Sequence, residues 1–400
     1  MRILIGHNHY KIPGGEDAVV TAEYSLLKDF GADVLLYKRN NVELDSRSIT
    51  TKFRNMRQLG WSPETYRDIK TMIRRFRPDV AHFHNIFYVM TPAAYFACRD
   101  EDVPVVQSQH NFRIVCSNGL LYRQNKVCED CPNKSLWQGV YHGCYGNSRV
   151  LTAFIAKMLM DHWKKRTWQD MVDMYITASR FGRQKLIAAG IDGGKITVKP
   201  NFVYPDPGVS GKIRCKRYAL YIGRLSAEKG VNVLLAAWRS VPDFPLRIIG
   251  DGPLSGSLKD YVQRHGMSNV EFCGYVNQVE YEQNMRESSF LIVPSVCYEN
   301  FPRVVAEAFA YGVPVLASRL GSLEEIIEDK GNGMLFEAGN PPALAQQAQW
   351  LIGHGNELEQ MAVRARDTFE QKYSAHQNYE QLMTVYQKVT QQESATCALS

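Results

Sequence analysis

Short apolar runs alternate with longer amphipathic segments along the first half of the chain. The runs predict strands at residues 3–6, 33–37, 80–83, 103–107, 174–177 and 196–198. Residues 17–30 have helical periodicity, and Gly31 is a suitable residue for the C-terminal end of that helix. Strands separated by helices predict βαβ units and therefore a parallel sheet.

The alternation is interrupted by a segment rich in Pro and Gly, residues 204–211, and then resumes. The second half has predicted strands at 219–222, 246–249, 270–272, 290–293 and 315–317, with helices such as 233–239, 304–311 and 343–352. We predict two doubly wound α/β domains of similar size. Because open parallel sheets bind ligands beyond the carboxyl ends of their strands, we expect the two domains to face a central cleft.

The expected domain boundaries follow from this pattern. The N-terminal domain would span residues 1–202, the linker 203–211 and the C-terminal domain 212–372. Residues 373–400 would form a C-terminal helix that packs back toward the N-terminal domain and frays at its end.

Composition and charge exclude several classes of protein. The 400 residues are 45% hydrophobic and 22% charged, which is typical of a globular chain and excludes a largely disordered, collagenous or coiled-coil one. No apolar run reaches the roughly 18 residues of a membrane-spanning helix, and the first apolar run is too short for a secretion signal. We therefore expect a cytoplasmic protein. A net charge of +6 is no argument for nucleic acid.

Basic residues are concentrated in two stretches. Residues 52–77 carry a net charge of +6, from eight basic and two acidic side chains. A second group, Lys157, Lys164, Lys165 and Arg166, lies among apolar residues that include Trp163 and Trp168. Either a solvated helix face backs onto the core, or a helix lies on an anionic membrane surface. The second interpretation predicts a peripheral protein at the inner face of the cytoplasmic membrane.

Two loops have residues that suit phosphate. Gly14-Gly15 follows the first strand and precedes a helix, where free N–H groups can meet an anion, although an ordinary turn would have the same sequence. Arg224 and Lys229 flank the loop after the first strand of the second half, and two cations above a helix start suit a diphosphate. The alternative is a surface loop in which Ser226 caps the helix.

A third segment, residues 295–315, runs from a strand end into a helix and has two glutamates eight positions apart. Glu299 would lie in the loop and Glu307 within the helix, with Pro302 near the first turn. A carboxylate facing a cleft can accept paired hydrogen bonds from sugar hydroxyls. Acidic residues favoured by the helix dipole are the alternative.

This segment resembles the E-x7-E region of the retaining, nucleotide-sugar-dependent glycosyltransferases of the GT-B fold, the group 1 or family 4 type. That family includes bacterial transferases for lipopolysaccharide, capsule and exopolysaccharide. The similarity extends over nearly the whole chain, and its motifs are Gly14-Gly15, Arg224…Lys229, Gly250-Asp251-Gly252-Pro253, Glu299…Glu307 and Gly312-Val313-Pro314-Val315.

The resemblance implies the donor site. Arg224 and Lys229 would bind the donor diphosphate, Glu307 the ribose and Glu299 the transferred sugar. The main-chain N–H groups near Phe301 and Val304 would meet sugar or phosphate, and Gly14 and Gly15 would close against the donor from the other domain.

The resemblance also implies an acceptor side and a mechanism. His110 would lie near the reacting sugar, His84 and Asn85 would touch the acceptor, and His82 would be packed. The acceptor hydroxyl would attack from the face that the diphosphate leaves. We expect no Asp-x-Asp metal motif in the sequence, no cofactor for catalysis and a UDP- or GDP-sugar donor.

The implied function is transfer of a hexose-type sugar to a growing cell-surface glycan, carried on a polyprenyl diphosphate. A soluble transferase making a small glycoside or glycolipid is one alternative. A GT-B protein that binds sugar nucleotides without turnover is the other, although the intact set of Arg224, Lys229, Glu299 and Glu307 argues against it.

Four cysteines form a separate group inside residues 111–148. Cys116, Cys128, Cys131 and Cys144 have the spacing C-x11-C-x2-C-x12-C. In a reducing compartment this spacing suggests a structural tetrahedral zinc that would order a long loop. Buried thiols and a redox disulfide are the alternatives.

Overall fold

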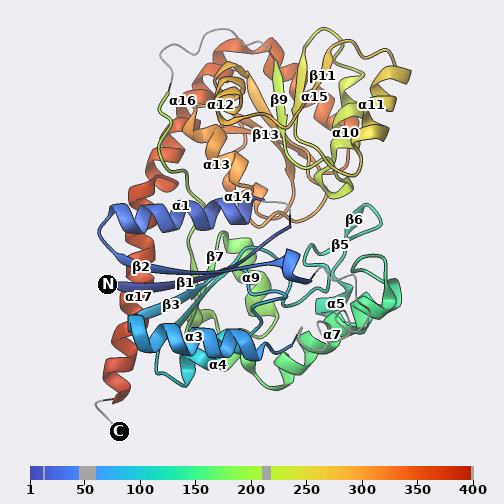
Figure 1. Ribbon diagram of the computed structural model, residues 1–400. Helices are drawn as coiled ribbons and strands as arrows, with labels where there is room; N and C mark the ends of the chain where they lie inside the picture. The colour runs from blue at the N-terminus through green and yellow to red at the C-terminus, as the bar shows by residue number, and fades with distance from the viewer. Residues whose placement is uncertain (12–13, 45–59, 210–217, 398–400) are drawn as a thin grey trace. The chain divides into compact units, whose positions relative to one another are not determined.

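The computed structural model describes residues 1–11, 14–44, 60–209 and 218–397. The chain divides into two compact units (Figure 1). The N-terminal unit consists of Met1–Leu121, Cys128–Pro200 and His376–Ser400, and the C-terminal unit of Tyr122–Val127 and Asn201–Ala375. Part of the predicted basic stretch, with Lys52, Arg54 and Arg57, and the end of the predicted linker lie outside the described residues.

The N-terminal unit is built on a six-stranded parallel sheet with the order β2-β1-β3-β4-β7-β8. Its strands are β1 (Arg2–His9), β2 (Asp33–Asn40), β3 (Val80–Phe83), β4 (Val105–Gln109), β7 (Met174–Thr177) and β8 (Ile196–Val198). Ile3 of β1 pairs with Val34 on one side and with Val80 on the other.

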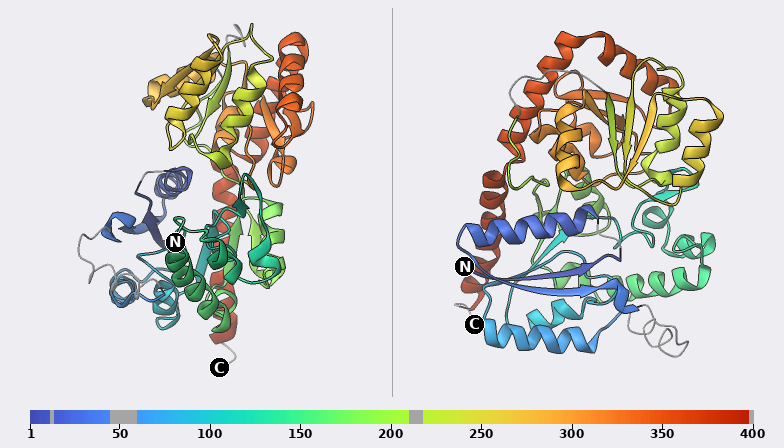
Figure 2. Two further views of the ribbon diagram at one scale, coloured as in Figure 1. Left: turned by 90° about the vertical axis from the view of Figure 1, so that its right-hand side faces the viewer. Right: turned by 45° about the horizontal axis from the view of Figure 1, so that its top comes forward.

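Helices cover both faces of this sheet (Figures 1 and 2). They are α1 (Gly15–Asp29), α3 (Pro63–Phe76), α4 (Ala93–Arg99), α5 (Asp130–Asn133), α6 (Trp137–His142), α7 (Arg149–Lys164), α8 (Thr167–Asp170), α9 (Arg180–Ala188) and α17 (Ala375–Cys397), with short 3-10 turns at Asn41–Leu44 and Gly193–Lys195. Val20 and Leu27 of α1 and Leu382 of α17 join the same apolar core against β1 and β3. The last helix of the chain is therefore part of the N-terminal unit.

The C-terminal unit has a second six-stranded parallel sheet, with the order β11-β10-β9-β12-β13-β14. Its strands are β9 (Ala219–Ile222), β10 (Leu246–Ile249), β11 (Val270–Gly274), β12 (Phe290–Val293), β13 (Val315–Arg319) and β14 (Gly333–Glu337). A short antiparallel pair, β5 (Tyr122–Arg123) and β6 (Lys126–Val127), groups with this unit.

The helices of the C-terminal unit follow its strands in turn. They are α10 (Val231–Trp238), α11 (Ser255–Arg264), α12 (Gln278–Glu287), α13 (Arg303–Ala310), α14 (Leu323–Ile326), α15 (Pro341–Gly353) and α16 (Gly355–Lys372), with a 3-10 turn, η3, at Ala227–Lys229. In α10, Val231, Leu234, Leu235 and Trp238 recur at helical spacing, and all are fully buried. Each such side chain contributes roughly 1.5–3 kcal/mol of burial free energy.

Each sheet has a point at which its strand order reverses. The reversal lies between β1 and β3 in the N-terminal unit and between β9 and β12 in the C-terminal unit. Ligands of doubly wound sheets bind beyond the carboxyl ends of the strands at this point. The loops after β1, β3, β9 and β12 are therefore the candidate ligand-binding regions.

The predicted fold class is confirmed, because both units are doubly wound, Rossmann-like α/β sheets. Every predicted strand is present, with bounds that differ by at most a few residues. Strand β14 and the β5–β6 pair were not predicted. None of the helices in the described part of the chain is long and apolar enough to cross a membrane.

Candidate active site

The loops after β9 and β12 bring together a lysine and a glutamate. Lys229 ends η3, and its Nζ donates to Oε1 of Glu299 at 2.7 Å. The Ser295 hydroxyl donates to the same carboxylate oxygen at 2.6 Å. Two residues 70 positions apart thus meet at the point where the strand order of the C-terminal unit reverses.

Arg224 lies in the same loop as Lys229 and is more exposed. Its guanidinium pairs with Glu228, and its Nε donates to the Ser226 hydroxyl at 3.2 Å. The Ser226 hydroxyl in turn donates to Glu228 at 2.6 Å and makes no capping hydrogen bond to the following turn. The predicted alternative, a capping Ser226, is therefore not what this side chain does. The Arg224 side chain is 58% exposed, which leaves its guanidinium accessible to an anion.

The charges of this loop shift two pKa values. Burial alone would lower the pKa of Lys229, but the neighbouring Glu299 carboxylate outweighs it, and the pKa is raised. Burial alone would raise the pKa of Glu228, but hydrogen bonding from Ser226 and the Arg224 charge outweigh it, and the pKa is lowered. Lys229 is therefore a cation at neutral pH, and Glu228 is an anion.

Close main-chain approaches shape the same loops. Gly230 has φ +70°, and a Cβ there would lie 1.8 Å from the Pro294 carbonyl oxygen. At Gly250, with φ +125°, a Cβ would lie 2.1 Å from the Gly223 carbonyl oxygen. Only glycine fits either position, so both glycines are needed for the loops to meet.

Glu307 lies within α13, as predicted, while Glu299 is in the loop that precedes it. The Glu307 carboxylate pairs with Nε of Arg303 at 2.9 Å and accepts a hydrogen bond from the Tyr281 hydroxyl. Tyr281 comes from α12, and burial together with Glu307 raises its pKa well above the usual value. Nothing in the spacing of the sequence pointed to Tyr281.

The segment between the two glutamates is held by side chains from elsewhere in the C-terminal unit. Asn201 Nδ2 donates to the Phe301 carbonyl at 2.9 Å, and the Ser322 hydroxyl donates to the Glu299 carbonyl at 2.7 Å. Val304 lies in the first turn of α13, where main-chain N–H groups have no intrahelical partner. The predicted roles of Phe301 and Val304 rest on such N–H groups and stay predictions.

In the N-terminal unit, the predicted histidines lie at the carboxyl ends of β3 and β4. His82 is fully buried, and its ring nitrogens contact the Tyr386 hydroxyl at 2.7 Å and the Ser108 hydroxyl at 2.8 Å. Nδ1 of His84 lies 2.9 Å from Nε2 of His110, and the two rings stack. Burial lowers the pKa of His110 to about 3, so its ring is neutral at pH 7.

Both side chains that were predicted to touch the acceptor, His84 and Asn85, are buried. The Asn85 side chain is buried: Nδ2 donates to the Asn8 carbonyl at 2.8 Å, and Oδ1 accepts from the Phe87 N–H at 3.0 Å. Its amide thus holds the loop after β3 and is not presented to a ligand. His84 is only 2% exposed, so it can act on a ligand only through His110.

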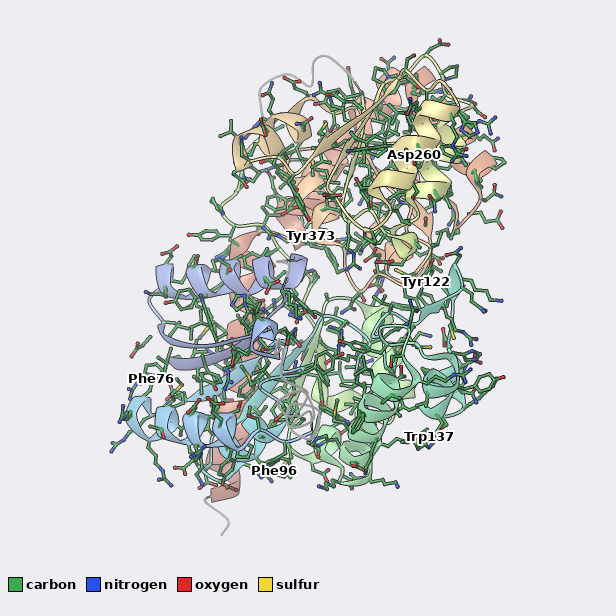
Figure 3. The ribbon with its side chains drawn as sticks, turned by 45° about the vertical axis from the view of Figure 1, so that its right-hand side comes forward. Phe76, Phe96, Tyr122, Trp137, Asp260 and Tyr373 are labelled. Carbon is green, nitrogen blue, oxygen red and sulfur yellow. The ribbon has the colours of Figure 1, made fainter. Side chains whose placement is uncertain are left out.

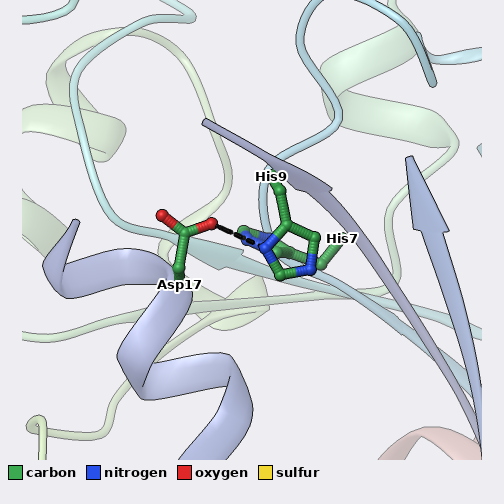
Figure 4. Close-up of side chains that lie close together, drawn as sticks. All are labelled: His7, His9 and Asp17. Carbon is green, nitrogen blue, oxygen red and sulfur yellow. Dashed lines mark hydrogen bonds and ion pairs between the residues drawn. The ribbon is translucent and has the colours of Figure 1, made fainter. Parts of the chain in front are cut away.

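Gly15 begins α1, and Gly14 is the residue just before it. A cluster of polar side chains beside them was not predicted. Asp17 accepts from the Gly14 N–H at 2.8 Å, and its other oxygen lies 3.0 Å from Nε2 of His7 and 2.9 Å from Nδ1 of His9 (Figure 4). His7 and His9 lie on the same face of β1, two residues apart, so the period of the strand could have revealed this pair.

This cluster and a second one have donor atoms close enough together to suggest a metal ion: His7, His9 and Asp17, and Glu23, His82 and His84. Their hydrogen bonds fit a metal poorly. The Asn85 N–H donates to Nδ1 of His7 at 3.4 Å, so the proton of His7 lies on Nε2, the atom that faces Asp17. Both nitrogens of His82 are already engaged.

The four cysteines of the predicted zinc site are thiols in the structure. The Cys131 thiol has Cys116, Cys144 and Cys128 among its electrostatic neighbours, and burial raises its pKa to about 12. Within the described part of the chain, no three of these sulfur atoms come within 4.8 Å of one another. The four thiols are thus grouped, but they are not yet at metal-ligand spacing.

The expectation of no Asp-x-Asp sequence was wrong. Asp100 and Asp102 form one, in the turn that precedes β4. Asp100 pairs with Lys70 at 3.4 Å, and the intervening Glu101 pairs with Arg74 at 2.9 Å. This turn is at the amino end of β4, the opposite edge of the sheet from His110, so it does not supply a metal site next to the histidines.

The second basic group lies on α7 and in the short connection from α7 to α8. Lys157, Lys164, Lys165 and Arg166 are exposed, as either interpretation required. Trp168, however, is 1% exposed and belongs to the core, and Nε1 of Trp163 donates to the Ile114 carbonyl at 2.8 Å. Neither tryptophan is available to insert into a membrane.

Comparison with known proteins gives the family. Residues 207–368 match the glycosyl transferases group 1, and residues 27–206 match glycosyltransferase family 4. The phosphatidyl-myo-inositol mannosyltransferase of Mycobacterium leprae is 30% identical over 281 residues, which cover 65% of this chain and 71% of that protein. The amylovoran biosynthesis glycosyltransferase AmsK of Erwinia amylovora is 27% identical over 231 residues, 54% of this chain and 56% of that protein.

The matched part of the chain spans about half the length of other curated relatives, 48% and 45% for two uncharacterised glycosyltransferases of Methanocaldococcus jannaschii. Among solved structures, sucrose-phosphate synthase from Thermosynechococcus elongatus has a TM-score of 0.69 at 15% identity, covering 99% of this chain and 100% of that one. Anabaena HepE in complex with UDP has a TM-score of 0.66 at 17% identity, with the same coverage. These structural likenesses show the GT-B fold, and together with the sequence relatives they place this chain in the glycosyltransferase family of the group 1 and family 4 type.

Proposed function

We propose that this chain is a retaining glycosyltransferase that moves a hexose-type sugar from a UDP- or GDP-sugar to a growing cell-surface glycan. The observation that carries the proposal is the contact between Lys229 and Glu299, at 2.7 Å, where the strand order of the C-terminal unit reverses. A cation for a diphosphate and a carboxylate for sugar hydroxyls lie side by side there.

Arg224 and Lys229 would bind the donor diphosphate. Each is paired with a carboxylate in the absence of donor, Arg224 with Glu228 and Lys229 with Glu299. An anion of higher charge can compete for both cations, and Arg adds a planar fork of donors to the point charge of Lys. The two cations would then stabilise the charge that develops on the leaving diphosphate.

Glu299 would accept hydrogen bonds from the transferred sugar, and Glu307 from the ribose hydroxyls. Both carboxylates are positioned by neighbours, Glu299 by Ser295 and Glu307 by Tyr281. Main-chain N–H groups near Phe301 and Val304 would complete the donor site. Anabaena HepE has been solved with UDP and with UDP-glucose, which supports a nucleotide-sugar donor for a chain of the same fold.

The proposed chemistry needs no resident cofactor. The acceptor hydroxyl oxygen bonds to the anomeric carbon on the face from which the diphosphate oxygen departs, so the anomeric configuration is kept. The hydroxyl proton passes to the leaving diphosphate. Catalysis is then positioning and electrostatic support. In the N-terminal unit, His110 would lie near the reacting sugar, and Gly14 and Gly15 would contact the donor.

The acceptor would be a glycan on a polyprenyl diphosphate. The names of two relatives support a glycan-building role: AmsK acts in amylovoran biosynthesis, and WbpZ of Pseudomonas aeruginosa, 29% identical over 161 residues, 40% of this chain and 42% of that protein, is a D-rhamnosyltransferase. A lipid-linked acceptor would hold the enzyme at the inner face of the cytoplasmic membrane.

An exposed apolar and basic surface on α6 and α7 suits an anionic membrane. Trp137 is 54% exposed (Figure 3), Tyr141 is 69% exposed and Val150 is 63% exposed. The Arg149 guanidinium lies over the Tyr141 ring at 5.8 Å. These residues, rather than Trp163 and Trp168, are the ones that could enter a lipid interface.

A structural zinc would be held by Cys116, Cys128, Cys131 and Cys144. The grouping of three other thiols around Cys131 supports it, although the sulfur atoms would have to draw closer to reach Zn–S bonds of about 2.3 Å. The metal would order the loop and take no part in transfer.

The test is to incubate the protein with UDP-, GDP-, ADP- and dTDP-sugars and a crude lipid extract, and to determine the anomeric configuration of the product by NMR. Transfer from one donor to lipid-linked glycan with retained configuration is expected. Transfer only to a small water-soluble acceptor would favour the soluble alternative. Inverted product or donor binding without turnover would contradict the proposal.

A further inference from the structure

A buried chain of polar side chains connects Glu23 of α1 to His110 in the N-terminal unit. Oε2 of Glu23 lies 3.4 Å from Nε2 of His84, and Nδ1 of His84 lies 2.9 Å from Nε2 of His110. Glu23 is 1% exposed and His84 is 2% exposed. Sequence spacing could not reveal this connection, because Glu23 lies 61 and 87 positions before the two histidines.

The Glu23 carboxylate is held in place by a lysine. Nζ of Lys199, which follows β8, donates to Oε1 of Glu23 at 2.6 Å. A buried carboxylate needs such a counter-charge. The other oxygen, Oε2, and Nε2 of His84 have no hydrogen-bond partner in the described part of the chain, and the two atoms face one another at 3.4 Å. Buried polar atoms without partners are rare, so these two atoms are best explained by one another.

The contact between the two rings requires one particular placement of the protons on His84 and His110. A neutral imidazole has one N–H and one lone pair, and a contact between two imidazole nitrogens needs one of each. If the proton of His84 lay on Nδ1, the lone pair of its Nε2 would face the carboxylate, which is repulsive. With the proton on Nε2, facing Glu23, Nδ1 of His84 accepts from Nε2–H of His110.

We propose that Glu23 acts through His84 as a positioning residue that fixes the tautomer of His110, so that His110 presents an unprotonated Nδ1 as a hydrogen-bond acceptor for a sugar hydroxyl. The choice of a sugar hydroxyl rests on the proposed function, whereas the tautomer does not. Nδ1 of His110 has no hydrogen bond among the residues that the structure describes, and the ring is only partly buried.

The surrounding charges are consistent with neutral rings. His7 and His82 face His84 from β1 and β3, and Lys199 faces it from the segment after β8. Burial lowers the pKa of His84 well below its usual value, and the neighbouring histidines and Lys199 lower it further. Burial is also the largest influence on His110, and it outweighs the attraction of Glu23 for a proton. The tautomer, rather than the charge, is therefore what Glu23 controls.

The direct test is ¹⁵N NMR of the full chain labelled at histidine, because protonated and unprotonated imidazole nitrogens have well-separated shifts. In the wild type, His84 and His110 should both carry their proton on Nε2. Assignment uses the loss of each signal in His84→Gln and His110→Gln. A wild-type His110 protonated on Nδ1 would overturn the proposal, whatever the enzyme transfers.

Glu23→Gln should reverse the direction of the hydrogen bonds through His84 and His110. Lys199 would hold the amide oxygen, so the amide NH2 would face Nε2 of His84 and turn it into an acceptor. Nδ1–H of His84 would then donate to His110, whose own proton would move to Nδ1. The matched control is Tyr386→Phe. It removes the hydroxyl that contacts His82, a buried neighbour of His84, and should leave the tautomers of His84 and His110 unchanged.

Turnover distinguishes positioning from a merely structural role. Glu23→Gln should lower kcat/KM roughly tenfold to hundredfold, the effect of losing a hydrogen bond to substrate, while Tyr386→Phe stays within about twofold. Reversed tautomers with unchanged kcat/KM would contradict the link to the hydroxyl. If no donor supports any turnover, the proposed function fails, but the wild-type NMR spectrum still decides the tautomer of His110. That spectrum also decides it if the Glu23→Gln variant does not fold.

Discussion

The ammonium group of Lys229 lies 2.7 Å from the carboxylate of Glu299, between two loops that leave neighbouring strands of one sheet. Neither charge is fully hidden, since the side chains are 29% and 12% exposed. The side chains of a buried structural ion pair would be less exposed than these two, and those of a surface ion pair would be more exposed. The pair is preorganised and still accessible, as a site that exchanges an internal partner for a ligand requires.

Replacing either cation of this loop should stop transfer and leave the fold intact. Arg224→Ala and Lys229→Ala each remove a charge that would stabilise the leaving diphosphate, a loss of about 2.7–4 kcal/mol by analogy with oxyanion-hole donors. Donor turnover and the melting temperature are measured for each variant. Lys259→Ala, an exposed lysine of α11, is the matched control and should be neutral. Near-wild-type turnover in either variant would remove the diphosphate assignment.

Metal chelation should distinguish a metal needed for sugar transfer from a structural metal in the cysteine loop. If transfer needs no metal, EDTA leaves the initial rate unchanged, since the one Asp-x-Asp triplet of the sequence, Asp100 to Asp102, pairs with Lys70 and Arg74 at the other edge of the sheet. Immediate loss of activity, restored by Mg²⁺ or Mn²⁺, would contradict this. Slow loss with unfolding, together with metal analysis showing one zinc per chain, would support the cysteine site.

Asp17 should stabilise the N-terminal unit in a pH-dependent way. Burial alone would raise its pKa, but the hydrogen bonds from His7 and from the Gly14 N–H outweigh burial, and the pKa is lowered. Stability from a lowered carboxyl pKa is present above the unfolded value of about 3.9 and is lost as the pH falls through the folded value. Asp17→Asn should therefore cost about 1–3 kcal/mol at pH 7 and progressively less below pH ~4.

Urea unfolding of the wild type and Asp17→Asn between pH 7 and pH 3 measures this difference. Asp33→Asn is the control, because the Asp33 side chain is 65% exposed and contacts Arg2 only at 3.7 Å. A constant difference between wild type and Asp17→Asn at every pH would show that the charge of Asp17 is not the cause.

Membrane attachment should be reversible and salt-sensitive. The basic residues of α7 and the exposed Trp137, Tyr141 and Val150 would meet an anionic leaflet, with each Lys or Arg contributing about 1 kcal/mol within a Debye length. Liposome sedimentation with and without anionic lipid, at low and high salt, measures this, and Trp137→Ala should weaken it. Trp163→Ala is no useful probe, because that side chain anchors a loop. Equally low sedimentation under every condition would favour a soluble acceptor.

The sequence predicted those parts of the molecule that depend on local pattern. Buried parallel strands are continuous apolar runs, so most strands of both sheets could be located. Lys229 and Glu299 follow such strands and Glu307 lies in the next helix, so their positions could be predicted as well. Strand β14 was missed because its run, Gly333–Glu337, follows a polar turn and has a glycine at its start.

Contacts between distant segments were beyond sequence reasoning. The pairing of Tyr281 with Glu307 depends on how α12 and α13 pack, and the relation of Glu23 to His84 depends on how α1 covers the sheet. The sequence alone did not decide whether Asn85 and Trp168 face inward, because that depends on the neighbours of each residue in space.

Donor binding tests the central claim most directly. Thermal shift of the wild type with UDP-, GDP-, ADP- and dTDP-sugars should single out one nucleotide, and a ligand at 100 times its dissociation constant should add about 2.7 kcal/mol of stability. Lys229→Ala should abolish that shift, while Lys259→Ala keeps it. A shift that persists in Lys229→Ala, or wild-type protein that no nucleotide sugar stabilises, would contradict a diphosphate site at Lys229 and Glu299.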